Sequence, residues 1–204
     1  ARDRMVDRLI EAGRIERESI IEALRAVPRH EFIPESRRDA AYADRPLPIG
    51  DGQTISAPHM VGIMCDLLEL EAGEQVLEIG TGCGYHAAVT AEIVGSENVY
   101  SVEYVESLAD EARERLERLG YGDIRIRVGD GAEGWTEHAP YDAAYLTCAA
   151  PEIPGPIVEQ LRTGGRIVAP IGTERQTLVR AEKTETGLDR ERHGAVRFVQ
   201  MQGE

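Results

Sequence analysis

The chain has 204 residues, of which 42% are hydrophobic and 29% charged, a composition typical of one soluble globular domain. Its formal net charge of −14 argues against a nucleic-acid backbone as the main partner, because such binding needs clustered lysine and arginine. The sequence has no uninterrupted apolar run near the roughly 20 residues of a membrane-spanning helix.

The basic residues are almost all arginines, since Lys183 is the only lysine among 23 basic positions. An excess of carboxylates with hardly any lysine resembles the proteins of halophilic archaea, which work where concentrated salt shortens the Debye length to about 3 Å. An acidic protein from an organism with a GC-rich genome is the alternative. The segment ARDRMVDRLIEAG is charged and lacks the apolar core of a secretion signal, so we expect a cytoplasmic protein.

Three cysteines and five histidines are scattered along the chain. Neither set has the close spacing of a zinc site or of a redox pair. We therefore expect reduced thiols and no structural metal.

The first 74 residues are predicted to begin with helices and to continue as loops. Apolar residues at helical spacing predict helices over residues 4–13 and 18–27. Prolines and glycines exclude long regular elements over residues 28–60, and so long a loop in a compact domain is more often functional than not. Another helix is predicted over residues 60–70.

Strands and helices alternate from residue 75 onward. Strands are predicted over residues 75–79, 99–104, 124–130, 141–148 and 166–172, with helices over 85–94, 106–120 and 155–165. This alternation implies right-handed crossovers and a doubly wound α/β fold with a mostly parallel sheet. Two last strands, over 177–184 and 195–201, are predicted to pair antiparallel at the sheet edge across a turn-rich segment.

The motif EIGTGCGYH, residues 78–86, follows the first predicted strand. Ligands of such sheets bind at the carboxyl ends of the strands, where the strand order reverses. Gly80 and Gly82 match the dinucleotide fingerprint, but Tyr85 stands where that fingerprint has its third glycine. We interpret the turn as the site of a shorter, phosphate-free ligand.

Acidic residues stand at three successive strand ends. Glu78 precedes the glycines, where a carboxylate would repel a pyrophosphate but attract an ammonium or sulfonium group. Glu103 can accept both hydroxyls of a ribose, and Asp130 can bind an adenine amino group directly or through its neighbours. Any one of them could be a helix cap or a surface charge, but the three together are the pattern of S-adenosylmethionine sites.

These residues resemble the class I S-adenosylmethionine-dependent methyltransferases over roughly residues 75–170. The resemblance implies a Rossmann-like methyltransferase fold with S-adenosylmethionine as the cofactor and no metal. Residues 1–74 would then cover the site and residues 75–204 would form the cofactor-binding core of one domain. The residues implied in cofactor binding are Glu78, Gly80, Thr81, Gly82, Gly84, Tyr85, Glu103, Asp130 and Gly131.

Three further blocks narrow the resemblance. VPRHEFIP, RPLPIGDGQTISAPHM and TCAAPEIP are similar, nearly from end to end of the chain, to the protein L-isoaspartate O-methyltransferase family. LTCAAPEIP also lacks the N-P-P-Y-like motif of enzymes that methylate base nitrogens, which counts against a nucleic-acid substrate. The resemblance implies a monomer that methylates the free carboxyl of L-isoaspartyl residues in damaged proteins and peptides, with neither nucleic acid nor a membrane as partner.

The expected chemistry needs few catalytic groups. A carboxylate is already ionised at neutral pH, so it attacks the sulfonium methyl without a general base, and alignment of the reactants is the main requirement. The resulting ester collapses to a succinimide, which gives normal aspartate another chance to form. The absence of a catalytic triad from the sequence is therefore expected.

Ser56 matches the active-site serine of the family in the segment T-I-S-A-P. Its hydroxyl could orient the acceptor carboxylate, and a helix N-cap is the alternative role, although both can hold at once. His59, a lone histidine beside a helix start, is interpreted as a surface or capping residue. The residues implied in substrate binding are Gln53, Thr54, Ile55, Ala57, Pro58, Phe198 and Val199.

The chain departs from the family pattern in two places. Cys83 and His86 stand where many members have serine and glutamine, and Gln200 with Met201 replace the end of an F-V-P-L-like segment. The second departure leaves the peptide preference open. Two other functions also stay open: a nicotinamide oxidoreductase, which Glu78 and the missing third glycine disfavour, and a non-catalytic cofactor-binding module or a paralogue that methylates another carboxylate.

Overall fold

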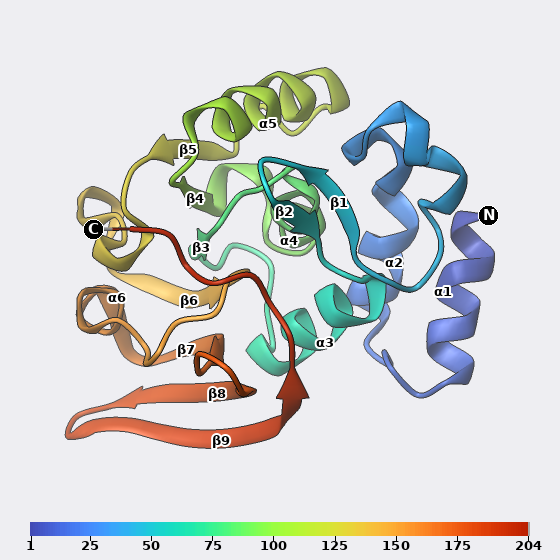
Figure 1. The fold of residues 1–204 in the computed structure, drawn as a ribbon. Helices are drawn as coiled ribbons and strands as arrows, with labels where there is room; N and C mark the ends of the chain where they lie inside the picture. The colour runs from blue at the N-terminus through green and yellow to red at the C-terminus, as the bar shows by residue number, and fades with distance from the viewer. Residues whose placement is uncertain (204) are drawn as a thin grey trace.

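The computed structural model describes residues 1–203, and a seven-stranded sheet with helices on both faces lies at its centre (Figure 1). The strand order is β5-β4-β3-β6-β7-β8-β9. The strands are β3 (Val76–Ile79), β4 (Val99–Glu103), β5 (Arg125–Val128), β6 (Tyr141–Leu146), β7 (Leu161–Ile171), β8 (Gln176–Thr184) and β9 (Gly187–Val196). All neighbours from β5 to β7 are parallel, and β8 and β9 are antiparallel, which confirms the doubly wound fold with a mostly parallel sheet.

The helices follow the predicted pattern except for the last, because the helix predicted over residues 155–165 ends at Gln160 and β7 begins at Leu161. They are α1 (Arg2–Glu11), α2 (Glu18–Ala26), α3 (Pro58–Leu68), α4 (Tyr85–Val94), α5 (Glu106–Leu119) and α6 (Gly155–Gln160). Because strand side chains alternate between faces, β3 contributes to two apolar clusters: Val76 packs into one, and Leu77 with Ile79 into the other. The first cluster also contains the buried faces of α1 to α4.

The chain reverses its direction of winding at β3. From β3 it passes to β4 and β5 at one edge of the sheet, then returns to β6 on the other side of β3. The carboxyl end of β3 is therefore the switch point at which such sheets bind ligands. The glycine motif begins at this point (Figure 1).

The predicted edge pair is partly wrong. β9 lies over Gly187–Val196, mostly within the turn-rich segment predicted over residues 185–194, and Thr184 pairs with Gly187 across a two-residue turn. A strand rich in charged residues is compatible with this place because both its faces reach solvent at the sheet edge. Residues after β9 instead cross the end of β6, where Ala149 N donates to Val199 O and Met201 N donates to Ala149 O, both at 2.8 Å.

The loop-rich segment is held by a buried arginine. The side chain of Arg29 is fully buried, its Nε donates to Ala41 O at 2.9 Å, and its guanidinium lies over the ring of Tyr85 at 4.8 Å. Burial lowers the pKa of Arg29 from its ordinary value. The contact connects the loops that precede α3 to the first residue of α4, beside the glycine turn.

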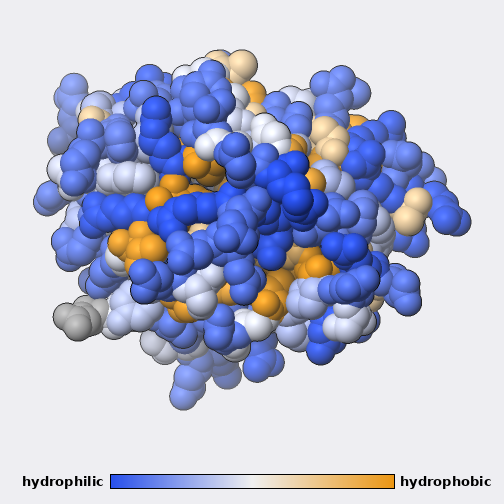
Figure 2. Space-filling model, turned by 90° about the horizontal axis from the view of Figure 1, so that it is seen from above, coloured by the Kyte–Doolittle hydropathy of each residue, from blue (hydrophilic) through white to orange (hydrophobic). Residues whose placement is uncertain are grey.

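Polar and charged residues cover most of the surface. Figure 2 shows a face on which apolar residues occur only in small separate patches between hydrophilic ones. Within residues 1–203, we find no helix that combines the length and the apolar character needed to cross a bilayer.

Candidate active site

The glycine turn after β3 has a backbone that only glycine adopts easily. Gly80, Gly82 and Gly84 have φ angles of +94°, +53° and +87°. A Cβ on Gly80 would overlap Oγ1 of Thr147, whose single hydroxyl proton lies between two acceptors, Gly80 O at 2.5 Å from Oγ1 and Ile79 O at 3.1 Å. The end of β6 thus closes directly onto the turn, and any side chain at residue 80 would disrupt this closure.

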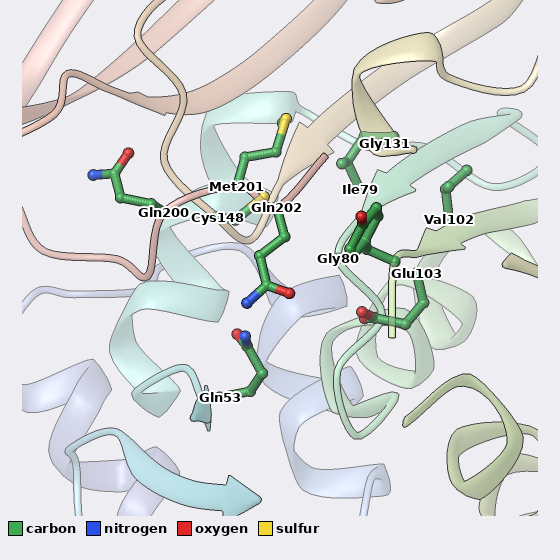
Figure 3. Close-up of a pocket in the computed structure, with 11 residues that line it drawn as sticks. Gln53, Ile79, Gly80, Val102, Glu103, Gly131, Cys148, Gln200, Met201 and Gln202 are labelled. Atoms are coloured by element: carbon green, nitrogen blue, oxygen red, sulfur yellow. The ribbon is translucent and has the colours of Figure 1, made fainter. Parts of the chain in front are cut away.

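A recess opens beside the turn at the carboxyl ends of β3 and β4 (Figure 3). We call it the acidic recess; its lining is Gln53, Ile79, Gly80, Val102, Glu103, Tyr104, Gly131, Cys148, Gln200, Met201 and Gln202. Glu103 lies on one side, and Gln53 and Gln202 point toward each other across the other side. No lysine or arginine belongs to this lining among residues 1–203, so it offers a pyrophosphate no cation.

Glu103 holds the turn and the next strand together. The residue is 6% exposed, with Oε2 accepting from Gly82 N at 2.8 Å and Oε1 accepting from Val105 N at 3.0 Å. A carboxylate has about four acceptor positions, so each oxygen can still accept a hydroxyl of a ligand. The residue is therefore both a structural part of the turn and an acceptor at the rim of the recess.

Glu78 does not line the recess. Because side chains alternate along β3, its carboxylate lies on the sheet face that α3 and α4 cover, with 0% exposure. It accepts hydrogen bonds from Ser101 Oγ at 2.5 Å and Tyr145 OH at 3.0 Å. Burial raises the pKa of Glu78 to about 8. Glu78 is therefore not placed for the direct contact with the cofactor that its position in the motif suggested.

The remaining residues expected in cofactor binding lie in different surroundings. Gly131 lines the recess, and Asp130 caps the short 3₁₀ helix Gly131–Glu133 by accepting from Ala132 N at 2.9 Å. Gly84 instead faces the side chain of Leu116. Tyr85 is buried at the start of α4.

Two more cavities continue from the recess toward the edge of the sheet. The inner cavity is lined by Thr54, Ile55, Ser56, Val61, Gly80, Thr81, Gly82, Cys83, Tyr85, His86 and Thr147. The outer groove is lined by Pro46, Thr54, Ser56, Ala57, His59, Met60, Thr147, Ala195, Val196, Arg197 and Phe198. The recess shares Gly80 with the inner cavity, which shares Thr54, Ser56 and Thr147 with the outer groove. The inner cavity therefore shares walls with both the recess and the outer groove.

Ser56 stands where the inner cavity meets the outer groove. It follows the two-stranded sheet of β1 (Leu47–Gly50) and β2 (Gln53–Ile55). The N-cap of α3 is Ala57 and has no side-chain hydrogen bond, so Ser56 does not cap the helix. Among the residues that the structure describes, its hydroxyl has no hydrogen-bond partner. The hydroxyl is thus available to a ligand.

The other residues expected in substrate binding divide between the cavities. Thr54 lines both the inner cavity and the outer groove, whereas Ile55 is buried and lines only the inner cavity. Ala57 and Phe198 line the outer groove, and Gln53 lines the recess. The structure leaves Pro58 and Val199 outside the linings of all three spaces.

Several lining residues were not among the expected ones. Tyr104 and Cys148 follow the ends of β4 and β6, so the rule that ligands bind at strand ends could have indicated them. Burial raises the pKa of Cys148 to about 12, which keeps its thiol protonated. His59, set aside as a surface or capping residue, lines the outer groove with its Nδ1 2.8 Å from Oδ1 of Asp44. No sequence pattern connects residues 44 and 59.

The recess and the inner cavity fit an adenosyl ligand with an amino-acid tail. Gly80 and Gly131 both border the recess and leave no room for a side chain, because a Cβ there would overlap Thr147 and Ile79, respectively. Its walls combine the apolar Ile79 and Val102 with the carboxylate of Glu103. Within residues 1–203, no group of three or more histidine, cysteine, aspartate or glutamate side chains is placed to hold a metal ion.

Comparison with known proteins gives one family. Its model, described as protein-L-isoaspartate(D-aspartate) O-methyltransferase, matches residues 1–204. Protein-L-isoaspartate O-methyltransferase 2 of Archaeoglobus fulgidus is 55% identical over 205 residues, which span 100% of this chain and 93% of that protein. Protein-L-isoaspartate O-methyltransferase of Methanothermobacter thermautotrophicus is 49% identical over 206 residues, spanning 99% and 95%.

Solved structures agree with the observed fold. A protein-L-isoaspartate O-methyltransferase structure superimposes with a TM-score of 0.91 at 32% identity, covering 100% of this chain and 66% of that longer chain. A Plasmodium falciparum structure in complex with S-adenosyl-L-homocysteine gives a TM-score of 0.88 at 24% identity, covering 100% and 99%.

Proposed function

The chain belongs to the protein-L-isoaspartate(D-aspartate) O-methyltransferase family, and on this premise we propose which of its residues move the methyl group of S-adenosylmethionine to the free carboxyl of an L-isoaspartyl residue. This reaction repairs damaged proteins, because the methyl ester leads through a succinimide back to aspartate. Family membership also decides against the nicotinamide oxidoreductase.

We assign the cofactor to the acidic recess and the inner cavity. Glu103 accepts the ribose hydroxyls, and Asp130 with Gly131 borders the adenine. Thr81 and Gly82 contact the amino-acid end from the inner cavity, which adjoins the recess at Gly80. When bound, S-adenosylmethionine supplies an electrophilic methyl group on a positively charged sulfur.

We assign the isoaspartyl peptide to the outer groove, with Ser56 as the catalytic residue. The single observation that carries this assignment is the place of the unpartnered Ser56 hydroxyl, where the inner cavity meets the outer groove. The hydroxyl donates to the acceptor carboxylate and aligns it with the methyl group. Thr54, Ala57 and Phe198 border the peptide on either side.

This assignment gives the two parts of the chain different tasks. Residues 1–74 cover the site and supply Gln53 to Ser56, whereas residues 75–204 form the core that holds the cofactor. All three spaces have walls from both parts, which supports this division. Both parts would form one domain.

Replacing Ser56 with alanine is expected to lower kcat/KM for an isoaspartyl peptide by about 100-fold, the scale of one lost transition-state donor. The affinity for S-adenosylhomocysteine should stay unchanged, because the hydroxyl is assigned to the peptide. Transfer of labelled methyl measures kcat/KM, and calorimetry measures the affinity for S-adenosylhomocysteine. Exposed Ser36→Ala is the matched control, and unchanged turnover in the Ser56 variant would remove the residue from the mechanism.

We further propose that the protein works as a cytoplasmic monomer of a halophilic organism, without nucleic acid or membrane as partner. The support is its net charge of −14 with one lysine among 23 basic positions. We expect methylation of an isoaspartyl peptide, but not of its aspartyl twin, to be faster in molar KCl than in dilute buffer. Equal or slower turnover in KCl would contradict the halophilic assignment without affecting the reaction.

A further inference from the structure

Five buried side chains form a continuous line of hydrogen bonds behind the glycine turn. We call it the hydroxyl chain: Thr81, Ser101, Glu78, Tyr145 and Thr90, in that order. The spacings are 2.6 Å from Thr81 Oγ1 to Ser101 Oγ, 2.5 Å from Ser101 Oγ to Glu78 Oε2, 3.0 Å from Tyr145 OH to Glu78 Oε1 and 3.0 Å from Thr90 Oγ1 to Tyr145 OH. Thr81, at one end, lies in the glycine turn.

The direction of the hydroxyl chain depends on the proton of Glu78. An ionised carboxylate only accepts, so Ser101 must donate to Glu78. A serine hydroxyl has a single proton, which forces Thr81 to donate to Ser101. In this state the Thr81 hydroxyl has no proton left for a ligand.

A protonated Glu78 reverses the half of the chain that leads to the turn. The acid donates from Oε2 to Ser101 Oγ, and the serine proton turns toward Thr81 Oγ1. The proton of the Thr81 hydroxyl is then free to point into the inner cavity, which Thr81 lines together with Gly80 and Gly82. Tyr145 donates to Oε1 in both states.

Within residues 1–203, no cationic side chain interacts with Glu78. The titratable groups that interact with it are Cys65 from α3, Tyr145 from β6 and Glu103 from β4, and His86 from α4 is in contact with Tyr145. His86 stacks on Tyr145 at 4.2 Å, and burial lowers the pKa of His86 to about 3, so it is neutral. Complete burial and the negative charge of Glu103 therefore favour the uncharged acid.

We propose that Glu78 is a positioning residue that, in its protonated form, makes the Thr81 hydroxyl a hydrogen-bond donor to the carboxylate at the amino-acid end of the cofactor. A donor suits an anionic group, whereas an acceptor would repel it. This inference rests on the proposed placement of the cofactor tail in the inner cavity. It assigns no contact between Glu78 and the sulfonium.

The test is the pH dependence of cofactor binding without methyl transfer. Calorimetry with S-adenosylhomocysteine between pH 6 and 10 should show an affinity that falls about tenfold as Glu78 ionises, the scale of one lost hydrogen bond to a charged group. Glu78→Gln should keep the high affinity at every pH, because its amide donates permanently to Ser101. Methylthioadenosine, which lacks the amino-acid end, should bind all variants with the same pH profile.

Two valine variants separate positioning from general damage. Thr81→Val should bind S-adenosylhomocysteine weakly at every pH, and Thr81→Ser should restore the pH-dependent affinity. Thr90→Val removes an equally buried hydroxyl from the far end of the hydroxyl chain and should keep the wild-type pH profile.

Two results would overturn the proposal. One is a Glu78→Gln variant with the same pH profile as the wild type. The other is a Glu78→Gln variant that loses affinity for S-adenosylmethionine but not for S-adenosylhomocysteine. That result would mean that the Glu78 carboxylate acts on the sulfonium charge. If the pH profiles of S-adenosylhomocysteine binding are as expected but the protein does not methylate isoaspartyl peptides, the result counts against the proposed function alone.

Discussion

Gly80→Ala is expected to weaken binding of S-adenosylhomocysteine by at least about 100-fold. Two costs combine at this residue. Its φ of +94° is a conformation that costs a residue with a Cβ about 1–2 kcal/mol. The new Cβ would also overlap Thr147 Oγ1, which fixes the turn through Gly80 O and Ile79 O. The turn must move, and it borders both the recess and the inner cavity.

Gly73→Ala is the matched control for this variant. Gly73 has a similar φ of +86°, but a Cβ there meets nothing within 4 Å. The control should lose a comparable free energy of unfolding, because alanine is strained in the same backbone conformation, and should keep its affinity for the cofactor. Adding Thr147→Ala to Gly80→Ala should restore part of the binding because it removes the overlapping atom. Equal losses in the two glycine variants would show that backbone strain alone decides the affinity.

Local patterns in the sequence were sufficient for most of the fold. The helix predicted over residues 85–94 is α4 (Tyr85–Val94), since it begins directly after the glycine turn and ends at Gly95. The central strands β3, β4 and β6 are buried, mostly apolar runs bounded by turns, a pattern that is easy to recognise in the sequence. The last strand was misplaced because an exposed edge strand can hold charged residues that read as a loop.

The site could be predicted only in part. Glu103 ends β4 and Gly131 follows β5, so their place at the recess follows from the sheet topology alone. Glu78 is different because β3 is buried on both faces, and an apolar run does not reveal which face a side chain joins. The crossing of Gln200 to Gln202 over the recess depends on the C-terminal segment leaving β9, which no local pattern indicated.

Glu78→Gln is expected to remove a large pH dependence from the stability of the free protein. Burial raises the pKa of Glu78 from its ordinary value of 4.5 to about 8. Between these values the folded protein keeps a proton that the unfolded chain has released, so the free energy of unfolding falls as pH rises from 4.5 to 8. At about 1.4 kcal/mol per pKa unit, the loss is on the order of 5 kcal/mol.

Urea unfolding of the wild type and the variant at pH 5, 7 and 9, without cofactor, measures this loss. We expect the wild type to lose stability relative to Glu78→Gln over this range, because glutamine has no proton to release. His86, with its pKa lowered to about 3, has the opposite effect, because it makes the free energy of unfolding rise between pH 3 and 6.5. Both proteins contain His86, so this effect cancels in the difference between them. Exposed Glu22→Gln should follow the wild type. Parallel curves for the wild type and the Glu78 variant would mean that Glu78 is ionised in the folded protein, and the reversal of the hydroxyl chain would then have no proton to drive it.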